Sequence, residues 1–161
     1  MVNATHKLID QFASKLSGSG APIRPEDNTS RLNALEADLP KRLPQSFTSL
    51  LSRYSFPSFD AAGITFFAWE ATRTDFSEVA LPLRDSLPEL LLPAGFVQVG
   101  RPDTGSFDAV CFKFDKSQNR EYPIVEVDHE EILCNFRVTI SRELWPSFRK
   151  LVEHWNTLRS L

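Results

Sequence analysis

The sequence lacks the features that mark membrane, secreted and nucleic-acid-binding proteins. No apolar run approaches the roughly 20 residues that cross a bilayer. Residues 1–16 carry charged side chains at helical intervals and have no unbroken apolar core of a signal peptide. The formal net charge is −3, so there is no overall basic field to attract phosphates. We therefore expect a cytoplasmic protein that binds neither membranes nor nucleic acids.

Cysteine is also scarce, with only Cys111 and Cys134 in the chain. Both lie in or beside apolar, strand-like segments, where a small buried thiol is commoner than a disulfide. Cys111 stands between Val110 and Phe112, so no adjacent histidine or cation lowers its pKa, and no serine stands in a Gly-x-Ser-x-Gly motif. These absences indicate a reducing compartment and argue against nucleophilic catalysis.

The composition of the chain is typical of a globular protein and includes many aromatic residues. Its 161 residues are 42% hydrophobic and 24% charged and include 13 Phe, which fits one domain with an aromatic core. We predict an N-terminal helix at 1–16, a Gly/Ser/Pro linker at 17–25 and a main domain at 26–161. The apolar stripe of the first helix packs either on the main domain or on a second copy of the chain, which would make a homo-oligomer.

Apolar residues at helical spacing predict further helices in the main domain. One begins among the capping residues 28–30, directs Leu32, Leu35 and Leu39 inward and ends at Pro40. The others are expected at 45–54, from 85 or 86 to 92, and from Pro146 towards the C-terminus, with a separate short turn at Ser141.

Short runs of β-branched and aromatic residues, closed by Gly, Pro, Asp or Asn, predict an antiparallel sheet. The strands are expected at 64–69, 95–101, 107–114 and 122–128, with an edge strand at 136–140, a loop at 57–63 and a hairpin tip at 115–120. We expect the strand at 107–114 to have one clearly more apolar face, and Glu126 to point away from the core that Val125 and Val127 face. The fold class is therefore α+β, a single domain with a mainly antiparallel central sheet and helices packed on it.

The sequence Asp128-His129-Glu130-Glu131, with Cys134 nearby, is the densest group of metal-ligating residue types. A zinc-protease helix needs a second histidine four residues after His129, but position 133 is leucine. Neighbouring residues at a strand end also point in different directions. We expect no metal and no cofactor, and we keep an enzyme or small-ligand protein with His129 as a general base beside Asp128 as a distant alternative.

The carboxylates of this region have two interpretations. A run of acidic residues is usually a solvated face, and the alternative is a negative patch that docks a basic protein.

Several ordered segments together resemble the SUKH superfamily, which includes the fungal Smi/Knr cell-wall regulators and many bacterial toxin-immunity proteins. The resemblance spans roughly residues 29 to 155, and it is carried by an opening helix followed by Leu-Pro, by central strands and by a closing helix. Its segments are Leu35-Glu36-Ala37-Asp38-Leu39, Leu43-Pro44 with Phe47, Leu50 and Leu51, Val99-Gly100-Arg101, residues 105–112 and 122–130, and Ser147-Phe148 with Leu151 and Val152.

The resemblance implies an α+β fold and a non-enzymatic binding protein, such as an immunity protein that neutralises a bacterial toxin by direct binding. An adaptor or regulatory scaffold without a toxin partner is the alternative. We predict that the partner contacts the polar edge of the sheet, at Asp103, Asp108, Glu126, Asp128, His129, Glu130 and Glu131.

Overall fold

The computed structural model describes residues 2–70, 90–114 and 120–158, and it confirms an α+β domain built on an antiparallel sheet. The helices are α1 (Val2–Gly18), α2 (Thr29–Ala37), α3 (Gln45–Arg53), α6 (His129–Asn135) and α7 (Phe148–Thr157). The strands are β1 (Arg24–Pro25), β2 (Tyr54–Ser55), β3 (Phe59–Ala61), β4 (Ile64–Phe66), β5 (Phe96–Pro102), β6 (Ala109–Lys113), β7 (Ile124–Val127) and β8 (Ile140–Trp145).

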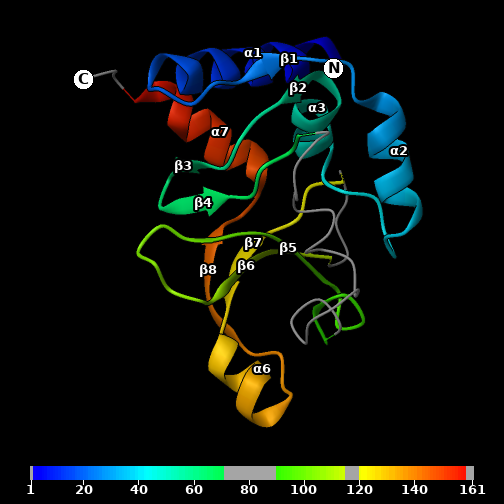
Figure 1. The fold of residues 1–161 in the computed structure, drawn as a ribbon, viewed down its shortest axis with the longest axis vertical. Helices are drawn as coiled ribbons and strands as arrows, with labels where there is room; N and C mark the ends of the chain where they lie inside the picture. Colours follow the sequence, from blue (N-terminus) through cyan, green and yellow to red (C-terminus); the bar gives the residue numbers. More distant parts are fainter. Residues whose placement is uncertain (1, 71–89, 115–119, 159–161) are drawn as a thin grey trace.

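The main sheet is a meander in which each strand pairs antiparallel with its neighbour in the order β3-β4-β5-β6-β7-β8. Helices α1, α3 and α7 lie together beyond one side of the sheet, and α6 projects at the opposite end of the molecule (Figure 1). In this meander the end of β5, the start of β6, the end of β7 and the start of β8 all meet at the end of the sheet that carries α6. This end brings together residues that are far apart in the sequence.

Both faces of the central strands are buried, contrary to the expectation of one clearly more apolar face. In β6, Val110 and Phe112 belong to the main core with α1, α3 and α7. Ala109 and Cys111 face a second, smaller cluster that includes Ile132 of α6. Because side chains alternate along a strand, this double cover explains why the strand sequences are apolar almost throughout.

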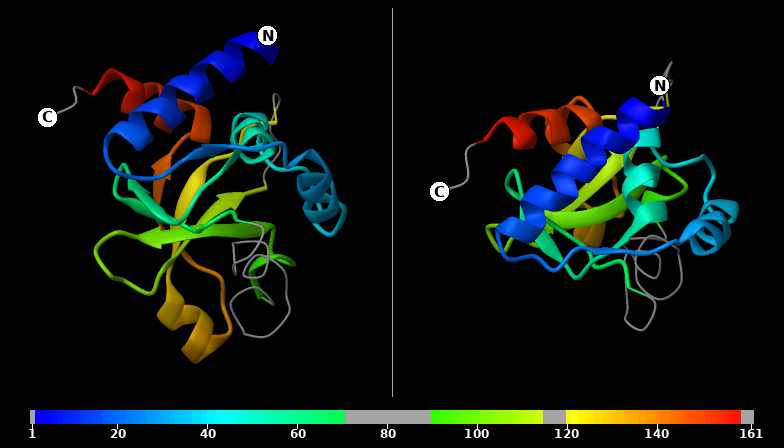
Figure 2. Two further views of the ribbon diagram at one scale, coloured as in Figure 1. Left: turned by 45° about the horizontal axis from the view of Figure 1, so that its top comes forward. Right: turned by 90° about the horizontal axis from the view of Figure 1, so that it is seen from above.

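The N-terminal helix packs on the main domain, which is one of the two arrangements that its apolar stripe allows. Ile9, Phe12 and Leu16 are fully or almost fully buried, and α1 lies across α3 and α7 (Figure 2). Residues 24 and 25 of the predicted linker form β1, which pairs with β2. The apolar stripe is therefore used within the chain, and a homo-oligomer formed through α1 stays a prediction.

The loop predicted at 57–63 is wrong in part, because it contains strand β3. Ala62 and Gly63 both have positive φ angles, 55° and 81°, and they form the two-residue turn between β3 and β4. Two successive residues with positive φ are typical of the tight turn that joins twisted strands. A strand of three residues is too short to show a period of two in the sequence.

The region after β7 also differs from the prediction. Residues 129–135 form helix α6, and the strand expected at 136–140 and the turn expected at Ser141 are replaced by strand β8. Helix α7 begins at Phe148, because the Ser147 hydroxyl accepts a hydrogen bond from the Lys150 N–H and caps the helix. Of the alternating residues Phe136, Val138 and Ile140, only Ile140 belongs to a strand, as the first residue of β8.

Two predicted elements, the cysteines and the lengths of the helices remain to be compared with the sequence. Most of the helix expected at 85–92 and most of the hairpin tip at 115–120 lie outside the described residues. Both cysteines are free, with Cys111 buried as expected and Cys134 exposed on α6. In the part of the chain that the structure describes, no helix combines the length and apolarity required to span a bilayer.

Candidate functional site

Asp128 is the residue between the end of β7 and the start of α6. Its Oδ1 accepts hydrogen bonds from the backbone N–H groups of Glu130, at 2.9 Å, and Glu131, at 3.4 Å. These donors have no partner within the helix, so the carboxylate is an N-cap, and its negative charge suits the positive end of the helix dipole. The acidic run thus has a structural role at its first helical turn.

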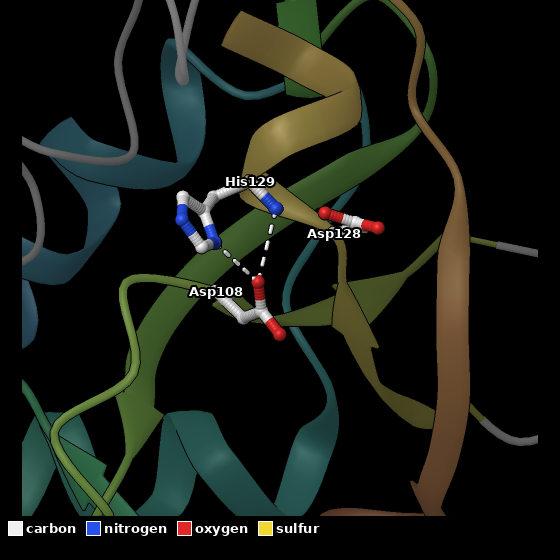
Figure 3. Close-up of side chains that lie close together, drawn as sticks. All are labelled: Asp108, Asp128 and His129. Atoms are coloured by element: carbon white, nitrogen blue, oxygen red, sulfur yellow. Dashed lines mark hydrogen bonds and ion pairs between the residues drawn. The ribbon is translucent and has the colours of Figure 1, made fainter.

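Asp108 holds His129 in place from the neighbouring strand. The Asp108 Oδ1 accepts the His129 backbone N–H at 3.0 Å and contacts Nδ1 of the ring at 2.5 Å (Figure 3). Because a carboxylate only accepts hydrogen bonds, Nδ1 of His129 carries the hydrogen of this contact. The other ring nitrogen, Nε2, takes no part in it. The partner of His129 is therefore Asp108 and not its sequence neighbour Asp128, which the distant enzyme alternative placed beside it.

The environment of Asp108 favours its charged form. Burial alone raises the pKa of this carboxyl, but hydrogen bonds from the backbone and ring of His129, and with the side chain of Glu126, outweigh burial and lower the pKa below its ordinary value of 3.8. Asp108 is thus a negative group that links the start of β6 to the start of α6.

Glu126 differs from the exposed carboxylates of the predicted surface because it is buried and has a cationic partner. Glu126 is 9% exposed, and its Oε1 accepts hydrogen bonds from the Arg142 guanidinium at 3.2 and 3.4 Å. The side-chain carboxylates of Asp103 and Glu130, by contrast, are exposed and have no hydrogen-bond or ion-pair partner among the described residues. All these residues lie towards one end of the sheet, but only part of the group is available to a partner.

Asp108, Asp128 and His129 form the one group of described residues whose ligand atoms, all within 4.8 Å of one another, could hold a metal ion. However, Nδ1 of His129 and Oδ1 of Asp108 bind each other, and Oδ1 of Asp128 caps α6. The three side chains are thus already engaged in holding α6 against the sheet. The absence of a bound metal stays a prediction.

Exposed apolar side chains that the sequence did not predict lie near these polar groups. Phe107, Leu133 and Phe136 are 64%, 56% and 74% exposed. The centre of the Phe107 ring lies 6.0 Å from the centre of the His129 ring, and Leu133, four residues after His129, lies on the same face of α6. Phe136 follows as the C-cap of α6, with a left-handed φ of 51°. No signal identified Leu133 and Phe136, because helix α6 itself was not predicted.

Replacing Asp108 with asparagine is expected to lower the free energy of unfolding by about 1 to 2 kcal/mol at neutral pH, the range for a hydrogen bond to a partly exposed charged group. A lowered pKa in the folded state adds stability above the pKa of the unfolded state, and this stability is lost as the pH falls through the folded-state value. The difference from the wild type should therefore shrink in urea titrations as the pH falls below the ordinary value of 3.8. The exposed Asp103→Asn is the control, and a penalty that stays constant with pH would contradict the assignment.

Comparison of the chain with protein-family models and with curated proteins finds no match.

Proposed function

We propose that this chain is a non-enzymatic protein-binding module that neutralises a bacterial toxin by direct binding, as an immunity protein of the cytoplasm. The observation that carries the proposal is the surface at the α6 end of the sheet, where exposed apolar side chains stand beside carboxylates without partners. We call it the α6 surface and define it as Asp103, Phe107, Glu130, Leu133 and Phe136.

The distribution of exposed apolar residues supports this location. Five large hydrophobic side chains are exposed in the described part of the chain, and four of them, Phe107, Leu133, Phe136 and Ile140, lie at the α6 end. Gathered apolar residues with a polar rim are typical of protein interaction sites, whereas single exposed ones are normal anywhere. Aromatic side chains in particular contribute much of the binding energy at such sites.

The charge of this surface indicates a basic partner. Asp103 and Glu130 are exposed, and the chain as a whole carries a net charge of −3. A toxin that acts on nucleic acid needs a basic surface for the phosphates, and an acidic, partly apolar surface would cover it. The resemblance of the sequence to the SUKH superfamily favours the same function.

An adaptor or scaffold would use the same surface, so the partner's identity decides between the two functions. The tagged protein would be used to capture partners from a lysate of the source cells, and the purified partner would be assayed with and without the chain. Stoichiometric inhibition of a toxic activity supports the immunity function. A partner whose activity is unchanged on binding supports the adaptor, and the lack of any partner contradicts both.

With the captured partner in hand, Glu130→Lys is expected to weaken binding roughly tenfold at low salt, and Leu133→Ala by a similar factor. The Glu130 effect should shrink at high salt because salt screens exposed charges, whereas the Leu133 effect should persist. Asp38→Lys makes the same change in net charge at the exposed C-terminal end of α2, away from α6, and should leave the affinity unchanged. Equal losses in Asp38→Lys and Glu130→Lys would show that only net charge matters.

A further inference from the structure

A second feature lies away from α6, where helices α1, α2 and α3 meet (Figure 1). Residues of these helices, together with Arg42 and Arg120, line a cavity of about 220 Å³ that is open to solvent on one side and has room for several waters or for one small molecule. Its wall includes His6, Glu36, Arg42, Gln45 and Arg120. Two arginines and a histidine therefore face one carboxylate in a chain whose net charge is negative.

Arg120 is the most unusual residue of this wall. Its backbone has a φ of 53°, a left-handed conformation that costs a residue with a long side chain about 1 kcal/mol or more. Its side chain is partly buried, and Nη2 donates to the Leu43 carbonyl oxygen at 3.2 Å. No carboxylate among the described residues forms an ion pair with it, so a partly buried positive charge faces the cavity uncompensated.

The other charged groups of the wall do not neutralise Arg120. The Oε2 of Glu36 accepts the Leu43 N–H at 2.8 Å, and Oε1 lies 3.9 Å from Nε of Arg42. Arg42 stands at the rim with 68% of its side chain exposed, so it is free to turn towards a bound group. Ser49, which is 6% exposed, adds a buried hydroxyl that has no hydrogen-bond partner among the residues that the structure describes.

We propose that this cavity binds a small-molecule oxyanion, a phosphate or carboxylate group held between Arg42 and Arg120. A guanidinium presents paired N–H groups that match the two oxygens of such an anion, and the bound charge would compensate Arg120. The backbone carbonyl oxygen of Arg120 also accepts the N–H of Gln45 at the start of α3, at 2.9 Å, which holds the residue at the wall of the cavity. The site is independent of the α6 surface and does not rest on the proposed toxin binding.

The test is a titration of the full chain with sodium phosphate and, separately, with sodium citrate, each against sodium chloride at matched ionic strength. Backbone amide NMR signals report the binding, and the signals of Gln45 and Thr48 are expected to shift in a saturable way with a Kd in about the millimolar range. Phosphate alone, or citrate alone, identifies which oxyanion the cavity takes. No saturable shift with either anion overturns the proposal.

Matched variants locate the binding. Arg120→Asn keeps a residue that tolerates the left-handed backbone and should weaken binding at least about tenfold, while Arg42→Gln should weaken it several-fold. Arg137→Gln, at an exposed arginine beside α6, should bind as the wild type does. If Arg120→Asn fails to fold, Arg42→Gln still decides the question, because its largely exposed side chain has little part in folding. Unchanged affinity in Arg42→Gln and Arg120→Asn would refute the site.

Discussion

Removal of residues 1–20 is expected to unfold the domain, because α1 is part of the main core. Burying one large apolar side chain contributes about 1.5 to 3 kcal/mol, so Ile9, Phe12 and Leu16 together supply about 5 to 9 kcal/mol. The whole folded state of a domain is usually stable by only about 5 to 15 kcal/mol. Deletion also exposes the apolar surfaces of α3 and α7 that these residues cover.

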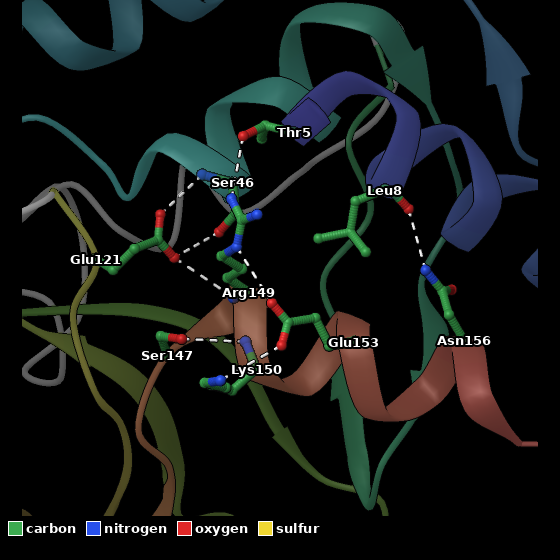
Figure 4. A network of polar contacts seen from close by, with 9 residues as sticks. All are labelled: Thr5, Leu8, Ser46, Glu121, Ser147, Arg149, Lys150, Glu153 and Asn156. Carbon is green, nitrogen blue, oxygen red and sulfur yellow. Dashed lines mark hydrogen bonds and ion pairs between the residues drawn. The ribbon is translucent and has the colours of Figure 1, made fainter. Parts of the chain in front are cut away.

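Polar contacts tie the same helix to both of its neighbours. On the α7 side, Arg149 donates to the Thr5 hydroxyl at 3.2 Å and Asn156 to the Leu8 carbonyl oxygen at 3.2 Å (Figure 4). On the α3 side, Arg53 and Tyr54 both donate to Asp10 at 2.6 Å. These bonds fix the orientation of α1, so it is not a loosely attached segment.

The measurement is the circular dichroism of the aromatic region together with the mass in solution. We expect the shortened chain to lose its cooperative unfolding transition and to aggregate. Gln11→Ala changes the exposed face of α1 and should leave stability within about 0.5 kcal/mol. A folded shortened chain with half the mass of the full-length protein would instead show that α1 dimerises the protein.

The helices and strands with strong periodicity could be predicted, because burial of one face imposes its spacing on the sequence. The third helix, predicted at 45–54, is observed as α3 at Gln45–Arg53, and the strand predicted at 95–101 is β5 at Phe96–Pro102. Helix α6 could not be predicted in this way. It has seven residues and one buried apolar side chain, Ile132, so its existence depends on the Asp128 cap and on contact with the sheet.

The candidate site was predictable in its location and not in its contacts. Strands that alternate in direction bring Asp103, Asp108 and Asp128 to one end, which follows once the meander is known. Which carboxylates are free depends on distant partners, as Arg142 shows for Glu126. Glu121 likewise depends on partners distant in the sequence. It accepts hydrogen bonds from Ser46 at the start of α3 and from the Arg149 N–H of α7, at 3.4 Å, and so connects the two helices.

Phe148→Ala is expected to lower the free energy of unfolding by about 3 to 5 kcal/mol, the usual cost of removing a fully buried phenyl ring. The ring is 0% exposed and lies 5.1 Å from Phe47, 5.8 Å from Phe12, 5.9 Å from Phe66 and 6.5 Å from Phe112, centroid to centroid. Each of these edge-to-face contacts adds to the loss of buried area. The cavity left behind would be bordered by α1, α3, β4 and β6, so it cannot close by moving one element.

Phe107→Ala is the matched control, because it makes the same chemical change at a ring that is 64% exposed on the α6 surface. We expect it to change the free energy of unfolding by less than about 1 kcal/mol in urea titrations, since little area is buried there and only the His129 and Arg101 contacts are lost. The same substitution should weaken partner binding, whereas Phe148→Ala should lower stability without altering the exposed surface. Similar losses of stability in both variants would mean that the aromatic residues do not form one packed core around Phe148. A large loss of stability in Phe148→Ala alone would separate the residues that hold the fold from those left exposed for a partner.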